Sequence, residues 1–360
     1  MTDQDHDGSH IKGLLLFNLF HTFWPKLLQH RGFLSAFVTP LIKVSRVSKR
    51  LDLEPRQFFS LLEYIEWNAS LAPDQRKCYT MKYYKGLGTS TSSEGREYFR
   101  NLSKHIVDFH WHDDRDSDAF DMIFSKARAA DREAWLVNEC APDAYLDTSA
   151  GAVSYRDFVN QELIPFSHAD NARSLPCVVN DLKISQRKVL FACRKRKLTS
   201  EVKLAQLAGY CSEHTAYHHG EASLHSTIIH MPQDFVGSTN LPLLAPSGQL
   251  GTRFQGGKDA ASPRCIFTQL QEHTRLIFPD EDDALLDGAV YYVPIIPMLL
   301  VNGAEGIGTG RSSSIPCHHP IHVIDNLLKL LENEEAGLEL ADVPLPPLSP
   351  WTKGFRGAIL

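Results

Sequence analysis

This sequence of 360 residues lacks the patterns that mark several classes of protein. Seven cysteines are present, but no two have Cys-x-x-Cys spacing, which argues against a disulfide framework and against a zinc site. The longest apolar stretches, LLLF from Leu14 and VPIIPMLLV from Val293, are too short or too rich in proline to predict a membrane-spanning helix. The N-terminus shows no signal-peptide pattern. We therefore expect a chain with no membrane segment that works in a reducing compartment.

The chain also lacks a recognisable nucleotide-binding loop. NGAEGIGTG, from Asn302 to Gly310, matches neither GxGxxG nor the GxxxxGK motif, because arginine and not lysine follows it. KGLGT, from Lys85 to Thr89, has two glycines that let the backbone approach a phosphate and a lysine that supplies charge. A plain turn is the alternative interpretation of this short segment.

Charge is unevenly distributed along the chain, although the net charge is −6. Between residues 183 and 203, eight cations accompany a single acid, Glu201. These cations are Lys183, Arg187, Lys188, Arg194, Lys195, Arg196, Lys197 and Lys203. Such a stripe predicts contact with nucleic acid, and a solvated helix face is the plainer alternative.

Local patterns predict an α/β unit at the start of the chain. Ser9 is a candidate N-cap for a helix, a strand is expected over 33–44, and a strand that leads into a glycine loop is expected over 78–89. Thr91 and Glu94 have the spacing of a capping box.

Further along, segment 113–175 is polar and is expected to serve as a connector, with a helical patch over 127–137. Residues 189–210 predict two short helices separated by a turn, which is typical of a helix-turn-helix.

Three acids near the N-terminus, Asp3, Asp5 and Asp7, alternate along the chain and would share one face of an extended segment. A calcium loop of the EF-hand type is excluded, because the twelfth position from Asp3 is Leu14 and has no carboxylate. Hard oxygen ligands in this arrangement suit Mg²⁺ beside a phosphate. A solvated acidic turn is the alternative, although like charges on one face repel unless a cation lies between them.

Two other pairs are ambiguous as isolated motifs. His218 and His219 are adjacent and point apart, with no cysteine at ligand spacing, so a zinc site is disfavoured. Cys265 follows Arg264 and is either a reactive thiol or an idle cysteine.

Several long strings, in this order, together resemble the DNA cleavage core of eukaryotic-type DNA topoisomerase II, a type IIA topoisomerase. They are TDQDHDGSHIKGLL, KYYKGLGTSTSSEGREYF, DLKISQRKVLF, YHHGEASL, GGKDAASPR and PIIPMLLVNGAEGIGTG. The resemblance extends from Met1 to about Arg311 and is weaker beyond it.

The resemblance implies an α/β plus α+β multidomain fold. We expect the C-terminal part of a Toprim (Rossmann-like) domain over 1–118 and a connector over 119–175. A winged-helix (helix-turn-helix) DNA-cleavage domain would follow over 176–300, and the truncated start of a tower domain over 301–360. The family also has an ATPase domain and a metal-binding glutamate upstream, so the chain is expected to be a fragment.

The resemblance also assigns roles to residues. Asp3, Asp5 and Asp7 would bind Mg²⁺, Arg264 would stabilise the transition state, and Ile315 would be an apolar wedge that bends the duplex. The remaining DNA contacts would be Lys85, Arg132, Lys183, Arg187, Lys188, Tyr217, His218, His219 and Ser223. Glu133 departs from the family, which commonly has lysine there, and should weaken that contact.

Cys265 is the main departure, because it occupies the position of the tyrosine that attacks DNA in the family. A cysteine sulfur lies much closer to its own backbone than a tyrosine hydroxyl does. We therefore expect no transesterification from this position.

The implied parent is an ATP-hydrolysing, Mg²⁺-dependent homodimer that passes one DNA duplex through a break in another and relaxes supercoils. This chain would bind and bend double-stranded DNA and be defective in cleavage. A non-catalytic DNA-binding module, or a dominant-negative partner in a mixed dimer, is the alternative. A Toprim nuclease or primase-like enzyme is a third possibility, but it would leave the winged-helix motifs unexplained. The family implies a nuclear location, with an organellar form as the alternative.

Overall fold

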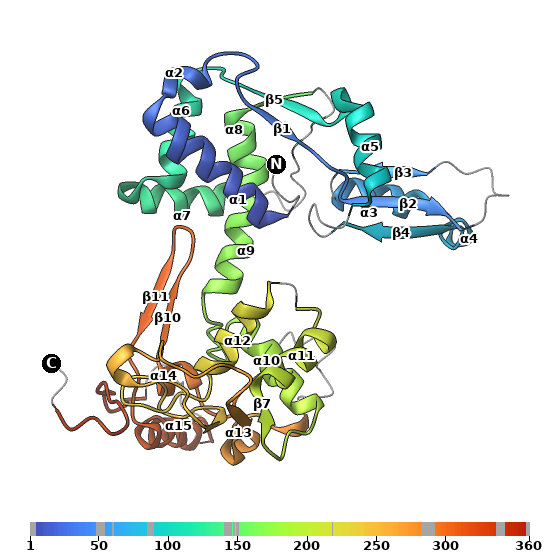
Figure 1. The fold of residues 1–360 in the computed structure, drawn as a ribbon. Coiled ribbons are helices and arrows are strands. Elements are labelled where there is room, and N and C mark those ends of the chain that lie inside the picture. The colour runs from blue at the N-terminus through green and yellow to red at the C-terminus, as the bar shows by residue number, and fades with distance from the viewer. Residues whose placement is uncertain are drawn as a thin grey trace. The chain divides into compact units, whose positions relative to one another are not determined.

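The computed structural model describes residues 5–47, 55–59, 61–84, 90–139, 146, 148, 151–217, 219–281, 292–335 and 343–357. Contacts between residues divide the chain into two compact units (Figure 1). Unit 1 comprises Met1–Asp170 with Thr309–Arg311, and unit 2 comprises Asn171–Gly308 with Ser312–Leu360.

Unit 1 begins with helix α1 (His6–Leu14). Asp5 caps this helix, and its carboxylate accepts a hydrogen bond of 2.7 Å from the N–H of Gly8. Our prediction of Ser9 as the N-cap is wrong, since Ser9 lies buried inside the helix. The carboxylate of Asp5 satisfies a free N–H and also meets the positive end of the helix dipole, so the helix begins one turn earlier than predicted.

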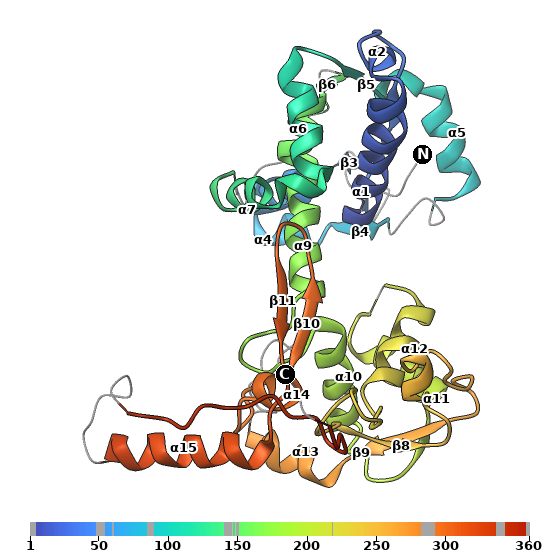
Figure 2. The same cartoon turned by 90° about the vertical axis from the view of Figure 1, so that its left-hand side faces the viewer.

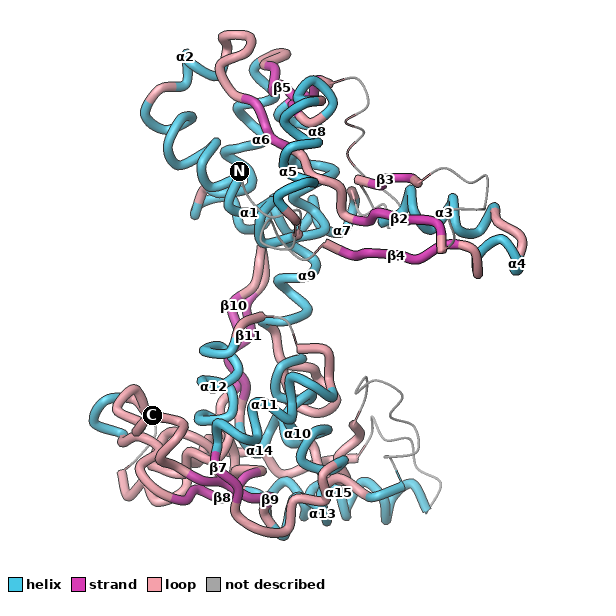
Figure 3. Tube along the Cα trace, turned by 45° about the vertical axis from the view of Figure 1, so that its right-hand side comes forward, coloured by secondary structure: helices cyan, strands magenta, loops and turns pink. Residues whose placement is uncertain are grey.

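Two three-stranded sheets lie in unit 1 (Figure 3). In the first, with strand order β1-β5-β6, β1 pairs antiparallel and β6 parallel to the central β5. The second has the order β3-β2-β4 and is antiparallel. The strands are β1 (Ser35–Phe37), β2 (Ile42–Arg46), β3 (Arg56–Phe58), β4 (Tyr79–Tyr83), β5 (Ile106–His110) and β6 (Ala152–Ser154). The helices after α1 are a π-helix (Leu15–His21), α2 (Pro25–Leu28), α3 (Leu61–Ser70), α4 (Pro73–Arg76), α5 (Ser92–Arg100), α6 (Asp114–Phe124), α7 (Ala129–Asn138), α8 (Tyr155–Asp157), a second π-helix (Phe158–Leu163) and α9 (Ile164–Ser174).

The predicted strand over 33–44 is two strands, β1 and β2, which belong to different sheets. Pro40 lies between them, and proline has no N–H with which to continue a strand ladder. The strand predicted at the start of 78–89 is confirmed as β4, and the glycine loop predicted after it, residues 85–89, lies outside the described residues. The capping box of Thr91 and Glu94 is confirmed at the start of α5, as is the helical patch, which is α7.

An aromatic core holds the first sheet and its helices together. Phe120, Tyr155 and Phe158 expose 1% or less of their surface. The ring of Tyr155 stacks on that of Phe109 in β5, with centroids 5.5 Å apart. Segment 119–175, expected as a connector, thus contributes much of this core.

The first part of unit 2 contains three helices and a small sheet, the arrangement of a winged helix. Helices α10 (Ile184–Lys195) and α11 (Leu204–His214) confirm the helix-turn-helix prediction, and α12 (Glu221–His230) packs against both. The antiparallel sheet has the order β7-β9-β8, with β7 (Val202–Lys203), β8 (Leu244–Ser247) and β9 (Phe267–Leu270). Fully buried apolar side chains fill the space between them, among them Val189, Leu190, Leu204, Leu207 and Ile228.

The later part of unit 2 carries a hairpin and a long helix (Figure 2). These elements are α13 (Glu272–Ile277), α14 (Met298–Asn302), β10 (Ala304–Ile307), β11 (Ser312–Ile315) and α15 (Pro320–Glu335). Asn240, 3% exposed, fastens this part: its amide donates to the carbonyls of Val301, His318 and Trp351 at 2.9, 3.3 and 3.1 Å. Its side-chain oxygen accepts from the N–H of Lys353 at 2.8 Å. Among the described residues, no helix is both long and apolar enough to cross a membrane.

Candidate nucleic-acid interface

Helix α10 presents predicted DNA contacts at its N-terminal end. Lys183 is the N-cap, and its N–H donates to the side chain of Gln186 at 2.8 Å. Arg187 lies one turn further along, so Lys183 and Arg187 share a face of the helix. Lys188 donates to the carbonyl of Ala216 at 3.4 Å and lies 5.9 Å from the ring centre of Tyr217. The first part of the predicted basic stripe is therefore arranged on one element.

Tyr217 connects this helix end to α12. Its hydroxyl donates to Ser223 at 3.2 Å, and its ring meets the ring of His219 edge to face at 5.6 Å. Lys188, Tyr217, His219 and Ser223, all predicted DNA contacts, thus lie together. His218, between Tyr217 and His219, is outside the described residues.

Arg194 does not belong to the exposed basic stripe, and that part of the prediction is wrong. Its side chain is 3% exposed, with the guanidinium donating to the carbonyls of Phe278 and Pro279 at 2.5 and 2.8 Å and to the carboxylate of Asp280 at 3.1 Å. A guanidinium can be buried when its several donors are satisfied in this way. Lys195, Arg196 and Lys197, by contrast, are exposed.

Asp181 lies immediately before the basic end of α10 and was not recognised in the sequence. Its backbone is left-handed, at φ 61°, a conformation that is uncommon for residues other than glycine but that aspartate and asparagine adopt more often than most. Burial raises the pKa of its carboxyl to about 8, against the opposing charge of Lys183. No sequence pattern signalled this, because the shift arises from tertiary burial.

The turn that carries Arg264 and Cys265 is exposed but fixed in place. The N–H of Cys265 donates to the carbonyl of Ser262 at 2.8 Å, which closes the turn. Two N–H groups at the start of α11 also bond to this segment: Leu204 donates to Ile266 at 3.0 Å and Ala205 to Pro263 at 3.2 Å. The thiol of Cys265 is free and exposed. The backbone of this turn therefore cannot easily move outward to compensate for the short side chain of Cys265.

The acidic motif differs from the predicted extended segment. Asp5 is the N-cap of α1 and Asp7 lies in its first turn, so the two do not alternate along a strand. Asp3 is outside the described residues. Within the described ranges, no three His, Cys, Asp or Glu side chains come close enough together to hold a metal ion. Asp5 and Asp7 still provide carboxylate oxygens, the ligand type that Mg²⁺ prefers.

Other predicted contacts of unit 1 have structural partners. Arg132 donates to the carbonyls of Met122 and Ser125 at 3.0 and 2.6 Å, at the end of α6. Glu133 forms an ion pair of 3.4 Å with Arg311. Lys85 lies outside the described residues.

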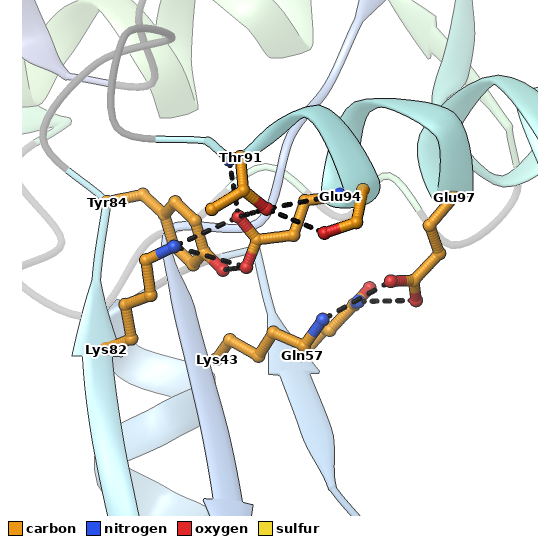
Figure 4. A network of polar contacts seen from close by, with 8 residues as sticks. Lys43, Gln57, Lys82, Tyr84, Thr91, Glu94 and Glu97 are labelled. Atoms are coloured by element: carbon orange, nitrogen blue, oxygen red, sulfur yellow. Dashed lines mark hydrogen bonds and ion pairs between the residues drawn. The ribbon is translucent and has the colours of Figure 1, made fainter.

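A polar network that the sequence indicated only through its capping box surrounds Glu94 (Figure 4). Glu94 accepts from the hydroxyl of Tyr84, from the amine of Lys82 at 3.0 Å and from the N–H of Thr91 at 2.8 Å. Burial would raise the pKa of Glu94, but the hydrogen bonds from Thr91, Tyr84 and Lys82 outweigh it and lower the pKa to about 2. Burial and the bond to Glu94 raise the pKa of Tyr84. The network joins the residues that flank segment 85–89 on both sides.

The hairpin of β10 and β11 carries the predicted wedge. Ile315 pairs with Ala304, and this pair lies on the more buried face of the hairpin. Ile307 lies on the opposite face and is 77% exposed. Ile315 therefore remains a prediction, and strand alternation identifies Ile307 as an exposed apolar residue that our sequence reasoning missed.

The sequence of this chain matches two protein-family models and is similar to several known proteins. The family model for the A subunits of DNA gyrase and topoisomerase IV matches residues 173–359, and the model described as "C-terminal associated domain of TOPRIM" matches residues 37–171. Over its whole length the chain is 50% identical to "DNA topoisomerase 2, mitochondrial" of Dictyostelium discoideum, 50% to "DNA topoisomerase 2" of Arabidopsis thaliana and 48% to "DNA topoisomerase 2-alpha" of Mus musculus. It covers 27%, 24% and 24% of those proteins, about a quarter of their length.

A solved structure agrees with these relatives. The chain superposes on the "topoisomerase II DNA-binding, cleavage and re-ligation domain" of Plasmodium falciparum with a TM-score of 0.79 and 48% identity, covering all of this chain and 48% of that one. The winged helix of unit 2, the two matching family models and the sequence similarity over all of this chain point to the same family. The chain therefore belongs to the type IIA DNA topoisomerase family, and it is of the eukaryotic type.

Proposed function

We propose that this chain binds and bends duplex DNA as part of the cleavage core of a homodimeric type II topoisomerase. One observation carries this proposal. The exposed turn of Arg264 and Cys265 is bonded to the first turn of α11, and α11 packs against α10, which bears Lys183, Arg187 and Lys188. Cations on a helix end beside a fixed turn suit a duplex backbone that must be held at a reacting position.

We propose further that position 265 does not cleave DNA in this chain. Transesterification requires the attacking atom to lie about 3–3.5 Å from the phosphorus, and a misplacement of ~1 Å costs ~10²-fold in rate. The sulfur of Cys265 is one bond from its Cβ, whereas a tyrosine oxygen lies beyond a whole ring. The bonds of Leu204 and Ala205 oppose any shift of the backbone toward the phosphate. Arg264 would still be placed to stabilise charge on a phosphate oxygen.

The carboxylates at the start of α1 suit a magnesium ion in the proposed role. Asp5 and Asp7, with Asp3, would hold Mg²⁺, which supplies positive charge beside the phosphodiester. Their oxygens fit this hard cation, and one carboxylate oxygen of Asp5 is already used by the N–H of Gly8. ATP would act on another part of the parent protein, and the present chain is assigned no ATP contact.

The remaining parts of the proposal concern DNA shape, assembly and location. Lys85, Arg132, His218 and His219 are further proposed DNA contacts. Ile315 is the proposed wedge, and Ile307, which is exposed on the other face of the hairpin, is a second candidate. Two copies would act on the two strands of a duplex. We propose a nuclear location, with an organellar one as the alternative, since one relative is named as mitochondrial.

Duplex binding at increasing salt tests the proposed function. A labelled duplex should bind to this chain with an affinity that falls steeply with salt, since each neutralised phosphate contributes a slope of about −0.9 in log K against log salt. Energy transfer between dyes at the duplex ends should report bending. A nearly flat salt response, or an unbent duplex, would contradict the proposal. Free cleavage products without a covalent adduct would instead favour a Toprim nuclease.

A further inference from the structure

The loop of residues 252–259, just before the Cys265 turn, presents one aromatic side chain almost entirely to solvent. Phe254 is 95% exposed, more than any other large apolar side chain among the described residues. It lies in the short 3-10 helix Arg253–Gln255. Single exposed apolar residues are common on proteins, so exposure alone assigns no role to Phe254.

This loop is held rigidly. Asp259 joins its two ends by accepting from both the N–H and the hydroxyl of Thr252, each at 2.8 Å, and these bonds lower the pKa of the Asp259 carboxyl. Gln233, 4% exposed, donates to the carbonyls of Leu250 and Gly257 at 2.7 and 3.2 Å. Gly257 has a φ of 79°, which favours glycine, and a Cβ there would also press on the side-chain amide of Gln233. The ring of Phe254 is therefore carried on a preorganised support.

The loop is also continuous with the proposed cleavage turn. The N–H of Ala261 donates to the carbonyl of Gln249 at 2.9 Å, which ties the base of the loop together four residues before Cys265. An extended chain advances by about 3.3 Å per residue, so Ala261, at the base of the loop, lies within about 13 Å of Cys265.

The charges around Phe254 favour a polyanion over a protein partner. Arg253, Lys258 and Arg264 are exposed, and Lys258 and Arg264 make no ion pair with any residue that the structure describes. The carboxylate of Asp259 is occupied by Thr252. Exposed cations beside an aromatic ring are typical of nucleic-acid surfaces, where the cations bind phosphates and the ring stacks on a base.

We infer that Phe254 makes an apolar contact with duplex DNA, stacking on or wedging beside a base near the Cys265 turn. This inference rests on the proposed DNA-binding function and adds a contact to it. The rigid loop would fix where along the duplex the ring enters, while Arg253 and Lys258 would bind the flanking phosphates. Apolar side chains act in this way at deformed base steps, and stacking tolerates any base sequence.

Anisotropy with a labelled duplex, using the whole 360-residue chain, tests the inference. Phe254→Ala should weaken binding roughly 5- to 150-fold without changing the salt slope, because an apolar contact releases no counterions. Phe254→Trp should bind like the wild type. Leu276→Ala, which removes another exposed apolar side chain, is the matched control and should have no effect. With 2-aminopurine placed at successive positions, one or two positions should change in fluorescence with Phe254 and not with alanine.

The possible outcomes separate the inference from the proposed function. If the wild type binds DNA with a steep salt response and Phe254→Ala binds equally well, the inference is wrong and the proposed function stands. If Phe254→Ala alters only self-association in sedimentation, Phe254 serves a protein contact and the inference is again wrong. If the wild type does not bind duplex DNA, both are wrong. Thermal melting of Phe254→Ala should match the wild type, since removal of an exposed ring leaves no cavity.

Discussion

The backbone N–H of Ala205, in the first turn of α11, donates a hydrogen bond of 3.2 Å to the carbonyl of Pro263, two residues before Cys265. This bond connects the helix-turn-helix directly to the turn that would present a nucleophile. The position of residue 265 is thus set by the fold, and its side chain alone decides whether it reaches a phosphate.

Cys265→Tyr should therefore create a covalent DNA adduct that Cys265 does not form. We expect at least about 10²-fold more protein linked to a labelled duplex with Mg²⁺, since ~1 Å of misplacement alone costs about that much. Denaturing gels would measure the adduct, in this chain and in one extended upstream. Cys265→Phe, which has the ring but no hydroxyl, is the control. An adduct with Cys265 itself would refute the argument from reach.

Removal of a cation from α10 should weaken DNA binding without regard to base sequence. Arg187→Ala and Lys188→Ala should each reduce the magnitude of the salt slope by about 1, as expected for one phosphate contact. Lys329→Ala, on the exposed side of α15, removes the same charge elsewhere and should leave the slope unchanged. Equal slopes for all four proteins would show that α10 does not contact phosphates.

Glu94→Gln should destabilise the second sheet of unit 1 by about 1.5–3 kcal/mol at pH 7, because hydrogen bonds to a charged group are lost. The pKa of Glu94 is lowered from 4.5 to about 2 in the folded protein, so its stabilisation is complete above about pH 4.5 and is lost as the pH falls toward 2. The difference between the two proteins should shrink over that range. Urea unfolding followed by tryptophan fluorescence would measure it.

Glu97→Gln is the matched control for this network. Glu97 accepts from Lys43 at 3.3 Å and Gln57 at 3.2 Å, but its side chain is 47% exposed. Exposed ion pairs contribute about 0–1 kcal/mol. If Glu94→Gln were no more destabilising than Glu97→Gln, the network would not be holding the sheet to α5.

Asn240→Ala should destabilise unit 2 by at least about 2 kcal/mol, since buried carbonyls lose their donor. Asn240→Asp should be no better, because a carboxylate would then face the carbonyls of Val301 and His318. Chemical denaturation should show a lower midpoint at an unchanged slope. Asn326→Ala, which removes one exposed bond to Pro346, serves as the control. A midpoint unchanged by Asn240→Ala would refute the role assigned to this side chain.

Asp181→Asn should stabilise the protein at neutral pH by about 1–3 kcal/mol, because it removes a partly buried carboxylate. The pKa of Asp181 is raised from 3.8 to about 8 in the folded protein. Between pH 3.8 and about pH 8 the folded protein therefore keeps a proton on this carboxyl that the unfolded chain has released. The contribution of Asp181 to the free energy of unfolding of the wild type therefore falls as the pH rises from 3.8 to about 8. The advantage of asparagine should therefore be large at pH 8 and small near pH 4. Exposed Asp234, changed to asparagine, should show no such trend.

Several elements of this fold were readable from local patterns. The capping box of Thr91 and Glu94 and the two helices of the helix-turn-helix depend on contacts within a few residues, so spacing alone predicts them. The order of the characteristic strings was sufficient to predict the family. The start of α1 was misplaced, because Asp5 and Ser9 are both good caps and only the folded chain selects one.

The sequence predicted which types of residue form the candidate site, but not how these residues are arranged. Arg187 and Arg194 are the same amino acid on one helix, and their sequence context does not distinguish them. In the structure, Arg194 is buried and donates to the carbonyl of Phe278. Ile307 and Ile315 are similar letters on one hairpin, and strand register places them on opposite faces. Local sequence specifies neither of these differences, because both depend on partners distant along the chain.

The order of amino acids was enough to specify the family, the chemistry available at the acidic and basic motifs, and the presence of a thiol at position 265. Which cations remain exposed, which carboxyls are buried and how firmly the Cys265 turn is held became visible only in the folded chain. The identity of a side chain determines which chemistry is available to it. Its pKa, exposure and position depend on desolvation and on hydrogen bonds from residues that are distant in the sequence. Asp181 in its buried surroundings and Pro263 with Ala205 are the two clearest cases.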